Sequence, residues 1–267
     1  MRTTVMIPLH RSWRWLPLVR DSLLTLRGHC AIIVSDVDEH DATLARLRDE
    51  FEADDDIAFV GARDVAPGWV AHANDLLARA STPLVMWLPH DDVIDETWII
   101  EAERALDAHP SAIAACGPLV ASAHSEPHLA VGLDPDETFT RRSRARRVVH
   151  AVDALERGDP ALLGILYRAV VRRERNPALP SRGELGVWSD AFWALELVSR
   201  GPIVITSARY AKTWHSESTI FTWTDPREDP AHLQRDVDRL VRRLPWASRA
   251  VVARAIRRQR RNAQEAP

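Results

Sequence analysis

Residues 83–92 read PLVMWLPHDD, and this stretch decides the fold class. Its apolar run, Leu84–Leu88, predicts a strand that is buried on both faces and that ends where polar residues begin. A second stretch, IIVSDVDEHDAT at residues 32–43, has the same design, because an apolar run leads directly into a group of carboxylates. Two buried strands are therefore predicted, each followed by an acidic loop.

The rest of the first half alternates short apolar runs with amphipathic helical patterns. This alternation is typical of a mostly parallel sheet with helices on both faces, so the predicted fold class is α/β. In the first half, strands are predicted at 5–7, 31–34, 57–60 and 84–88, and helices at about 15–26, 44–51, 68–80 and 97–108. Further on we expect strands at 113–116 and 202–205, a polar excursion at 123–147, helices at about 151–175 and 190–200, the latter capped by Gly201, and a C-terminal helical extension from about residue 230.

The composition fits an ordinary globular protein. The chain has 267 residues, 46% of them hydrophobic and 27% charged, which is enough to bury an ample core. Cys30 and Cys116 both lie in apolar runs, so we expect buried thiols in a reducing compartment and neither a disulfide scaffold nor a cysteine zinc site. No apolar stretch approaches the ~20 residues of a membrane-spanning helix, and the first residues lack a signal-peptide core. We expect a cytoplasmic protein.

Charge is distributed unevenly along the chain. Residues 1–140 contain 24 acidic and 10 basic residues, whereas residues 141–267 contain 14 acidic and 25 basic ones. Between Arg239 and Arg261 there are nine arginines and no acid, which suits a peripheral contact with an anionic membrane surface at the inner face of the membrane. A solvated helix packed on the domain explains the same pattern, and both interpretations stay open. No nucleic-acid reading motif accompanies the arginines, so nucleic acid is not an expected partner.

Ligands of open parallel sheets bind beyond the carboxyl ends of the strands. No glycine-rich phosphate motif lies there, which disfavours a dinucleotide dehydrogenase and a P-loop NTPase. Carboxylates repel a phosphate, but they hold a Mg²⁺ or Mn²⁺ ion that bridges to a diphosphate. The alternative is that these carboxylates only cap the helices that follow. The residues after the first, second and fourth strands include Pro8, His10, Asp36, Asp41, His90, Asp91 and Asp92.

At these residues the chain resembles the inverting family-2 glycosyltransferases of the GT-A fold. The resemblance implies a nucleotide-sugar-binding half at 1–117, an acceptor-binding and catalytic half at 118–229, and a basic helical tail at 230–267. It implies that Asp36 hydrogen-bonds the nucleobase and that Asp91 and His215 hold Mg²⁺ or Mn²⁺, with Asp92 supporting Asp91. The remaining nucleotide-sugar contacts implied by the resemblance are Pro8, His10, Asp41, Asn74, His90 and Asp92.

A later stretch, GVWSDAFWALELVSRGPI at 186–203, is similar to the family segment that carries the catalytic base. The resemblance implies that Asp190 is this general base and that Trp188 stacks on the acceptor. The sequence departs from the family pattern at Pro89, where the first metal-site aspartate is expected, and at Ser189, where an acid is expected.

The implied function is transfer of a sugar from a nucleoside-diphosphate sugar to a hydroxyl of a glycan, lipid-linked or small-molecule acceptor, as in polysaccharide biosynthesis. A catalytically silent nucleotide-sugar or glycan-binding protein of the same fold is the alternative. Donor binding without turnover would distinguish it.

Overall fold

The computed structural model of the chain describes residues 1–10, 12–36, 42–61, 69–94, 96–123, 126–133, 135, 137–156, 168–179 and 189–214, with separate positions between 238 and 257. The helices are η1 (Trp13–Trp15), α1 (Leu16–Leu26), α2 (Thr43–Glu50), α3 (Trp69–Arg79), α4 (Glu96–Ala108), η3 (Glu137–Thr140), α5 (Arg144–Glu156), η4 (Arg173–Arg175) and α7 (Ser189–Arg200). The strands are β1 (Thr3–Leu9), β2 (Ala31–Asp36), β3 (Ile57–Val60), β4 (Leu84–Trp87), β5 (Asp92–Val93), β6 (Ala114–Cys116), β7 (Leu119–Ala123), β8 (Glu126–Leu133), β9 (Val170–Arg172), β10 (Ile203–Ile205) and β11 (Tyr210–Trp214).

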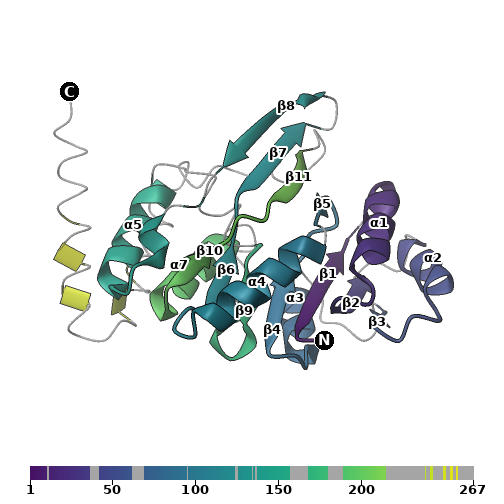
Figure 1. Cartoon of the computed structure of the whole chain (residues 1–267), viewed down its shortest axis with the longest axis horizontal. Helices are drawn as coiled ribbons and strands as arrows, with labels where there is room; N and C mark the ends of the chain where they lie inside the picture. Colours follow the sequence, from purple (N-terminus) through teal and green to yellow (C-terminus); the bar gives the residue numbers. More distant parts are fainter. Residues whose placement is uncertain are drawn as a thin grey trace.

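A seven-stranded, mostly parallel sheet forms the centre of the molecule (Figure 1). Its strand order is β10-β6-β9-β4-β1-β2-β3, and β9 alone among these strands runs antiparallel to its neighbours. The chain winds outward from β1 to β2 and β3 and then returns to the other side of β1 as β4. The carboxyl ends of β1, β2 and β4 therefore lie side by side, with a change in winding direction between β1 and β4.

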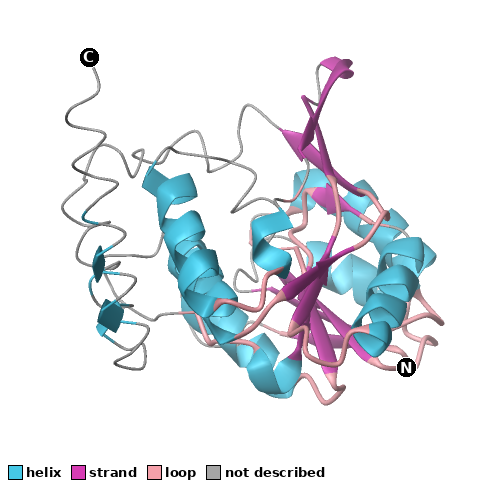
Figure 2. Ribbon diagram, turned by 60° about the vertical axis from the view of Figure 1, so that its left-hand side comes forward, coloured by secondary structure: helices cyan, strands magenta, loops and turns pink. Residues whose placement is uncertain are grey.

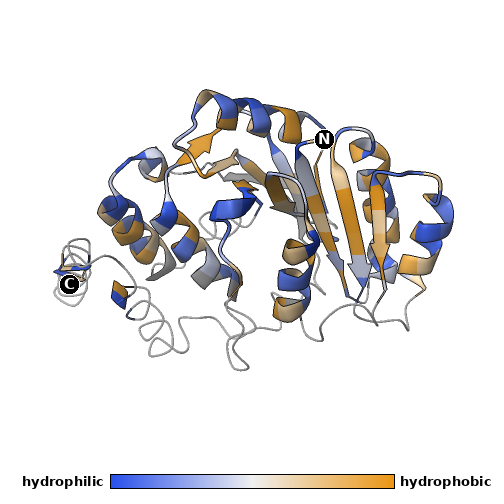
Figure 3. Ribbon diagram, turned by 90° about the horizontal axis from the view of Figure 1, so that it is seen from below, coloured by the Kyte–Doolittle hydropathy of each residue, from blue (hydrophilic) through white to orange (hydrophobic). Residues whose placement is uncertain are grey.

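Helices cover both faces of this sheet, as Figure 2 shows. In Figure 3 the strands are mostly orange, and the helices turn orange stripes inward and blue stripes outward. The core residues of β1, β2 and β4 are almost fully buried, which explains why these strands have continuous apolar runs instead of alternating patterns. The predicted α/β class, the helical positions in the first half and the buried thiols Cys30 and Cys116 are confirmed.

A second sheet, of order β5-β11-β7-β8, projects from the first. The prediction of a polar excursion at 123–147 was wrong, because this region contains β8, η3 and the start of α5. β8 is an edge strand that pairs only with β7 in the described structure, and such strands tolerate Pro127 and carry weak apolar patterns.

The predicted helical pair at 151–175 was wrong in its second half. Of the described residues in this range, α5 covers those up to Glu156 and η4 covers Arg173–Arg175, whereas residues 170–172 form β9 in the middle of the central sheet. Val170 and Val171 are buried between β4 and β6, where β-branched side chains pack well. A run of this length has no periodicity that separates a strand from a buried helix.

Gly201 follows α7 as predicted, but for a different reason from the one expected. Its φ is not positive, so it does not provide a left-handed cap. A Cβ at this position would lie 2.3 Å from Cγ2 of Ile113. The glycine therefore permits a close approach between the end of α7 and the strand region around Ile113.

Among the few described residues of the tail, Val241 is buried in the core. Val241 is 8% exposed and Ala253 packs beside the core, whereas the neighbouring Arg242, Arg249 and Arg254 are exposed. Part of the apolar face of the tail is thus covered by the domain itself. Among the described helices, none has the length and apolar character needed to cross a membrane.

Candidate functional site

The candidate site lies at the carboxyl ends of β1, β2 and β4. Asp36 is the last residue of β2, is 1% exposed, and pairs in register with Leu9 at the end of β1. Pro8 lies at the end of β1, and the exposed His10 follows this strand. The sheet therefore brings together the residues that the sequence predicts after its first two strands.

The loops after β1 and β4 are joined across the change in winding direction by Ser12. The Oγ of Ser12 lies 2.8 Å from Nδ1 of His90 and accepts a hydrogen bond of 2.9 Å from the backbone N–H of His10. Trp15 stacks on the His90 ring, with 6.2 Å between centroids and an interplanar angle of 19°. His10 and His90, which are 80 residues apart in sequence, are thus held in one network.

Asp92 belongs to a buried group with Arg168 and Tyr210. The Nε of Arg168 donates to Oδ2 of Asp92 over 2.6 Å, and the Tyr210 hydroxyl donates to the same oxygen over 2.9 Å. The Asp92 and Arg168 side chains are 0% and 7% exposed, and the guanidinium lies 5.3 Å from the centre of the Tyr210 ring. Asp91 precedes this group and is itself only 9% exposed.

The pKa values of both partners of Asp92 are shifted by burial and by the charge of Asp92. Burial lowers the pKa of the Arg168 guanidinium, but the charge and hydrogen bond of Asp92 and the smaller contributions of Tyr210 and Asp91 together outweigh burial and raise the pKa above its ordinary value. Burial, followed by the charge of Asp92, raises the pKa of Tyr210, so the phenol keeps the proton that it donates. The result is a fixed cation and a fixed hydroxyl directly behind the Asp91–Asp92 turn.

A second buried polar contact lies beneath Asp36. Ser35 precedes Asp36 in β2, and its Oγ forms a hydrogen bond with Nε2 of His72 on α3. His72 is 1% exposed, and burial is the main reason that its pKa is lowered to about 4. A neutral His72 therefore ties α3 to the strand that ends in Asp36.

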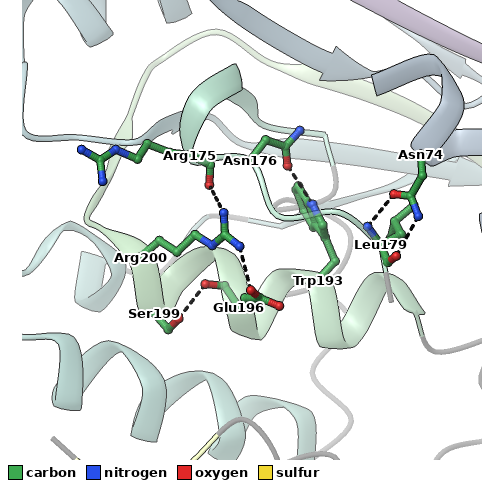
Figure 4. A network of polar contacts seen from close by, with 8 residues as sticks. All are labelled: Asn74, Arg175, Asn176, Leu179, Trp193, Glu196, Ser199 and Arg200. Atoms are coloured by element: carbon green, nitrogen blue, oxygen red, sulfur yellow. Dashed lines mark hydrogen bonds and ion pairs between the residues drawn. The ribbon is translucent and has the colours of Figure 1, made fainter. Parts of the chain in front are cut away.

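Asp190 lies in the first turn of α7, near the positive end of the helix dipole, which stabilises a negative charge. Figure 4 shows how this helix is connected to the first half of the chain. The Nε1 of Trp193 donates to Oδ1 of Asn176 over 2.9 Å, so the buried Trp193 is a packing residue. Asn74 of α3 forms two hydrogen bonds with the backbone of Leu179, one donated by Nδ2 over 2.8 Å and one accepted by Oδ1 over 2.7 Å. The segment 176–179 thus links the helix of Asp190 to α3.

The amide of Asn74 consequently has a structural role that the sequence did not predict. Three other predicted positions cannot be compared with the structure. Asp41, Trp188 and His215 lie outside the described residues. The described part of the chain contains no group of three or more His, Cys, Asp or Glu side chains arranged to hold a metal ion.

The sequence reasoning missed Arg168 and Ser12. Arg168 reaches the site because β9 is antiparallel to β4, which places the amino-terminal end of β9 beside the carboxyl end of β4. Reading residues 169–171 as a strand would have pointed to Arg168. Ser12 carries no comparable signal, because a serine shortly after a strand is common in any loop.

Similar solved structures identify the architecture. The S. aureus TarS fragment 1–349, solved in complex with UDP-GlcNAc, matches with a TM-score of 0.66 and 16% identity, over 96% of this chain and 72% of that chain. The chain has the GT-A glycosyltransferase fold. Glucosyl-3-phosphoglycerate synthase from Mycobacterium tuberculosis, solved with Mn²⁺, UDP-glucose and phosphoglyceric acid, matches with a TM-score of 0.52 and 16% identity, over 88% of this chain and 79% of that chain.

At sequence identities this low, the similarity to these structures shows the GT-A fold alone. The chain spans 43% of the longer TarS structure, which it matches with a TM-score of 0.63. No protein-family model and no curated protein matches the chain by sequence.

Proposed function

We propose that this GT-A protein transfers a sugar from a nucleoside-diphosphate sugar to a hydroxyl acceptor, with inversion at the anomeric carbon. The observation that carries the proposal is the convergence of Asp36 and Asp91 at the carboxyl ends of β2 and β4, on either side of β1. Ligands of open α/β sheets bind at such a change in winding direction. The TarS and synthase structures were solved with UDP or UDP sugars, which makes these the first donors to test here.

The proposed donor site uses residues of the first half, 1–117. Asp36 hydrogen-bonds the nucleobase, while Pro8, His10 and His90 line the donor, His10 and His90 held by their network with Ser12. Asp41 and Asn74 complete the predicted set, although Asn74 already bonds the Leu179 backbone. Neutral His72 bonds to Ser35, the residue before Asp36, and so ties the end of β2 to α3.

The described residues offer a divalent ion few ligands. The ligand that we propose is the Asp91 carboxylate, whereas Oδ2 of Asp92 accepts hydrogen bonds from Arg168 and Tyr210. A hard oxygen ligand of this kind suits Mg²⁺ or Mn²⁺, which take further ligands from substrate phosphates and water. The bound ion would neutralise charge on the leaving diphosphate. His215 remains our proposal for a second ligand, since β11 runs alongside β5 with Lys212 in register with Asp92.

The proposed chemistry in the second half, 118–229, depends on Asp190. An acceptor hydroxyl gives its proton to the Asp190 carboxylate while its oxygen bonds to the anomeric carbon. The bond from that carbon to the diphosphate breaks, and the nucleoside diphosphate leaves with the electron pair. Trp188 is proposed to stack on a sugar acceptor. The links through Asn176 and Leu179 support a fixed relation between the Asp190 helix and α3.

We further propose that the basic tail, 230–267, brings the enzyme to an anionic membrane surface that presents a lipid-linked acceptor. Exposed Arg242, Arg249, Arg254 and Arg257 support this role. Val241 is buried against the domain, so this residue is not offered to a membrane, and the proposed contact rests on the charge of the arginines.

A thermal-shift panel of nucleoside diphosphates, with and without Mn²⁺, tests the donor assignment. A ligand that binds only the folded state raises the melting temperature, so we expect a rise with one nucleoside diphosphate that is larger when Mn²⁺ is present. Stabilisation followed by release of nucleoside diphosphate from the matching sugar donor supports the transferase. Stabilisation without release, in the presence of a library of hydroxyl acceptors, supports the catalytically silent binding protein instead.

A further inference from the structure

The Asp91–Asp92 turn is held from behind by residues that lie far apart in the sequence. Asp92 forms β5, which pairs with β11, while Arg168 directly precedes β9 and Tyr210 begins β11. The backbone N–H of Asp92 donates to the Pro89 carbonyl over 3.1 Å, which closes the turn. Three separate segments therefore meet at one carboxylate oxygen.

Burying the Asp92 carboxylate costs free energy unless Arg168 and Tyr210 stay in position to bind it. A buried carboxylate needs a partner, and Arg168 and Tyr210 both direct a hydrogen to the same oxygen of Asp92. The Tyr210 ring also packs edge-on against the Trp98 ring, with 5.3 Å between the ring centroids, and this contact holds the hydroxyl in place. The Asp92 carboxylate is consequently fixed in position. The backbone of the adjacent Asp91 is held with it.

We propose that Arg168 and Tyr210 are positioning residues, which hold the Asp92 carboxylate inside the protein so that Asp91 is directed at the diphosphate. The inference rests on the proposed function, because it names what aligns the proposed metal ligand. Because position 89 is proline, Asp91 is the carboxylate ligand that we propose from this loop, and the buried cation and phenol hold its turn in place.

Arg147 offers a matched control. It is also buried, at 2% exposed, and donates to the carbonyls of Val198, Arg141 and Arg142 over 2.8, 2.5 and 2.9 Å. Its contacts join α5 to α7 and involve no residue of the Asp91–Asp92 turn. Arg147→Met therefore removes a buried guanidinium without touching the proposed alignment.

The test compares Arg168→Met, Tyr210→Phe and Arg147→Met in the full chain, with two measurements on each. Calorimetric titration with UDP and Mn²⁺ is expected to show an affinity loss of about 10–100-fold for the first two variants and none for the control, as is usual when the support of a metal ligand is removed. Hydrogen exchange of the peptide containing residues 88–92 is expected to accelerate in the same two variants. Tyr210→Phe keeps the ring and removes one hydroxyl, so it decides the question if Arg168→Met does not fold.

A double variant separates positioning from general stability. Arg168→Met with Asp92→Asn removes both buried charges, which restores stability relative to the single variant. Positioning predicts that the affinity for UDP and Mn²⁺ stays low after stability has recovered, whereas recovery of both would overturn the proposal. Unchanged hydrogen exchange at 88–92 in Tyr210→Phe would also overturn it. If the wild-type protein binds no nucleoside diphosphate, the proposed function fails, and the exchange measurement alone still decides whether Arg168 and Tyr210 fix the turn.

Discussion

Lowering the pH from 7 to 4 should destabilise the protein through His72, and replacing this histidine by glutamine should remove that part of the pH dependence. The pKa of His72 is lowered from 6.5 to about 4, chiefly by burial, with Asp75 opposing the shift and His10 adding to it. Between these two pH values the unfolded chain binds a proton at His72 and the folded chain does not. The free energy of unfolding therefore rises with pH across this window and levels off outside it.

The size of the effect follows from the shift. Each pKa unit corresponds to about 1.4 kcal/mol, so a lowering from 6.5 to about 4 is worth about 3 kcal/mol between pH 7 and pH 4. Because the side chain is 1% exposed, solvent screening takes little from this value. Protonation would also disturb the contact with Ser35, next to Asp36, so donor binding should weaken over the same range.

Urea denaturation of wild type and His72→Gln at several pH values between 4 and 7 measures this contribution. Glutamine keeps a polar group for Ser35 but does not titrate, and His109→Gln, at an exposed position after α4, is the control. Wild type and control should each lose about 3 kcal/mol more than His72→Gln on acidification. Parallel curves for wild type and His72→Gln, or an NMR titration that places the His72 pKa near 6.5, would refute the reasoning.

Four further outcomes are expected. Asp190→Asn should retain UDP binding in calorimetry while sugar transfer falls by about 10²–10⁴-fold, and near-normal turnover would move the general base elsewhere. Asp91→Asn, chosen because the position is buried, should abolish the Mn²⁺-dependent part of UDP binding with an unchanged melting temperature, and equal affinity with wild type would remove Asp91 as the ligand. Asn74→Ala should lower the free energy of unfolding by about 1–3 kcal/mol, since it removes two hydrogen bonds to Leu179, and an unchanged denaturation midpoint would show that the link is weak. In liposome co-sedimentation, replacing Arg249, Arg254 and Arg257 by Gln should reduce pelleting with anionic vesicles at low salt, whereas equal pelleting of both proteins would leave the tail a packing element.

The first half of the fold could be predicted because its strands are buried on both faces. β1, β2 and β4 each contain a continuous apolar run, and the helices between them bury one stripe each. Asp36, Asp91 and Asp92 were found for the same reason, since the point at which an apolar run ends is visible in the sequence.

The remainder depends on contacts that no local pattern records. β9 is a three-residue antiparallel strand inserted between β4 and β6, and β8 is an edge strand, so neither has a clear period. The partnership of Arg168 with Asp92 spans 76 residues and that of Tyr210 spans 118 residues, and both exist only once the two sheets are formed. Gly201 shows the same limit: its position was predicted, but its cause is the tertiary approach of Ile113.

The most direct test of the central claim is the release of nucleoside diphosphate from a panel of nucleoside-diphosphate sugars, measured with Mn²⁺ and a library of hydroxyl acceptors for wild type and Asp190→Asn. The account predicts release from at least one donor by wild type, a large loss in Asp190→Asn, and a product whose anomeric configuration, read by NMR, is inverted relative to the donor. Absence of release from every donor, or equal release by both proteins, would contradict it.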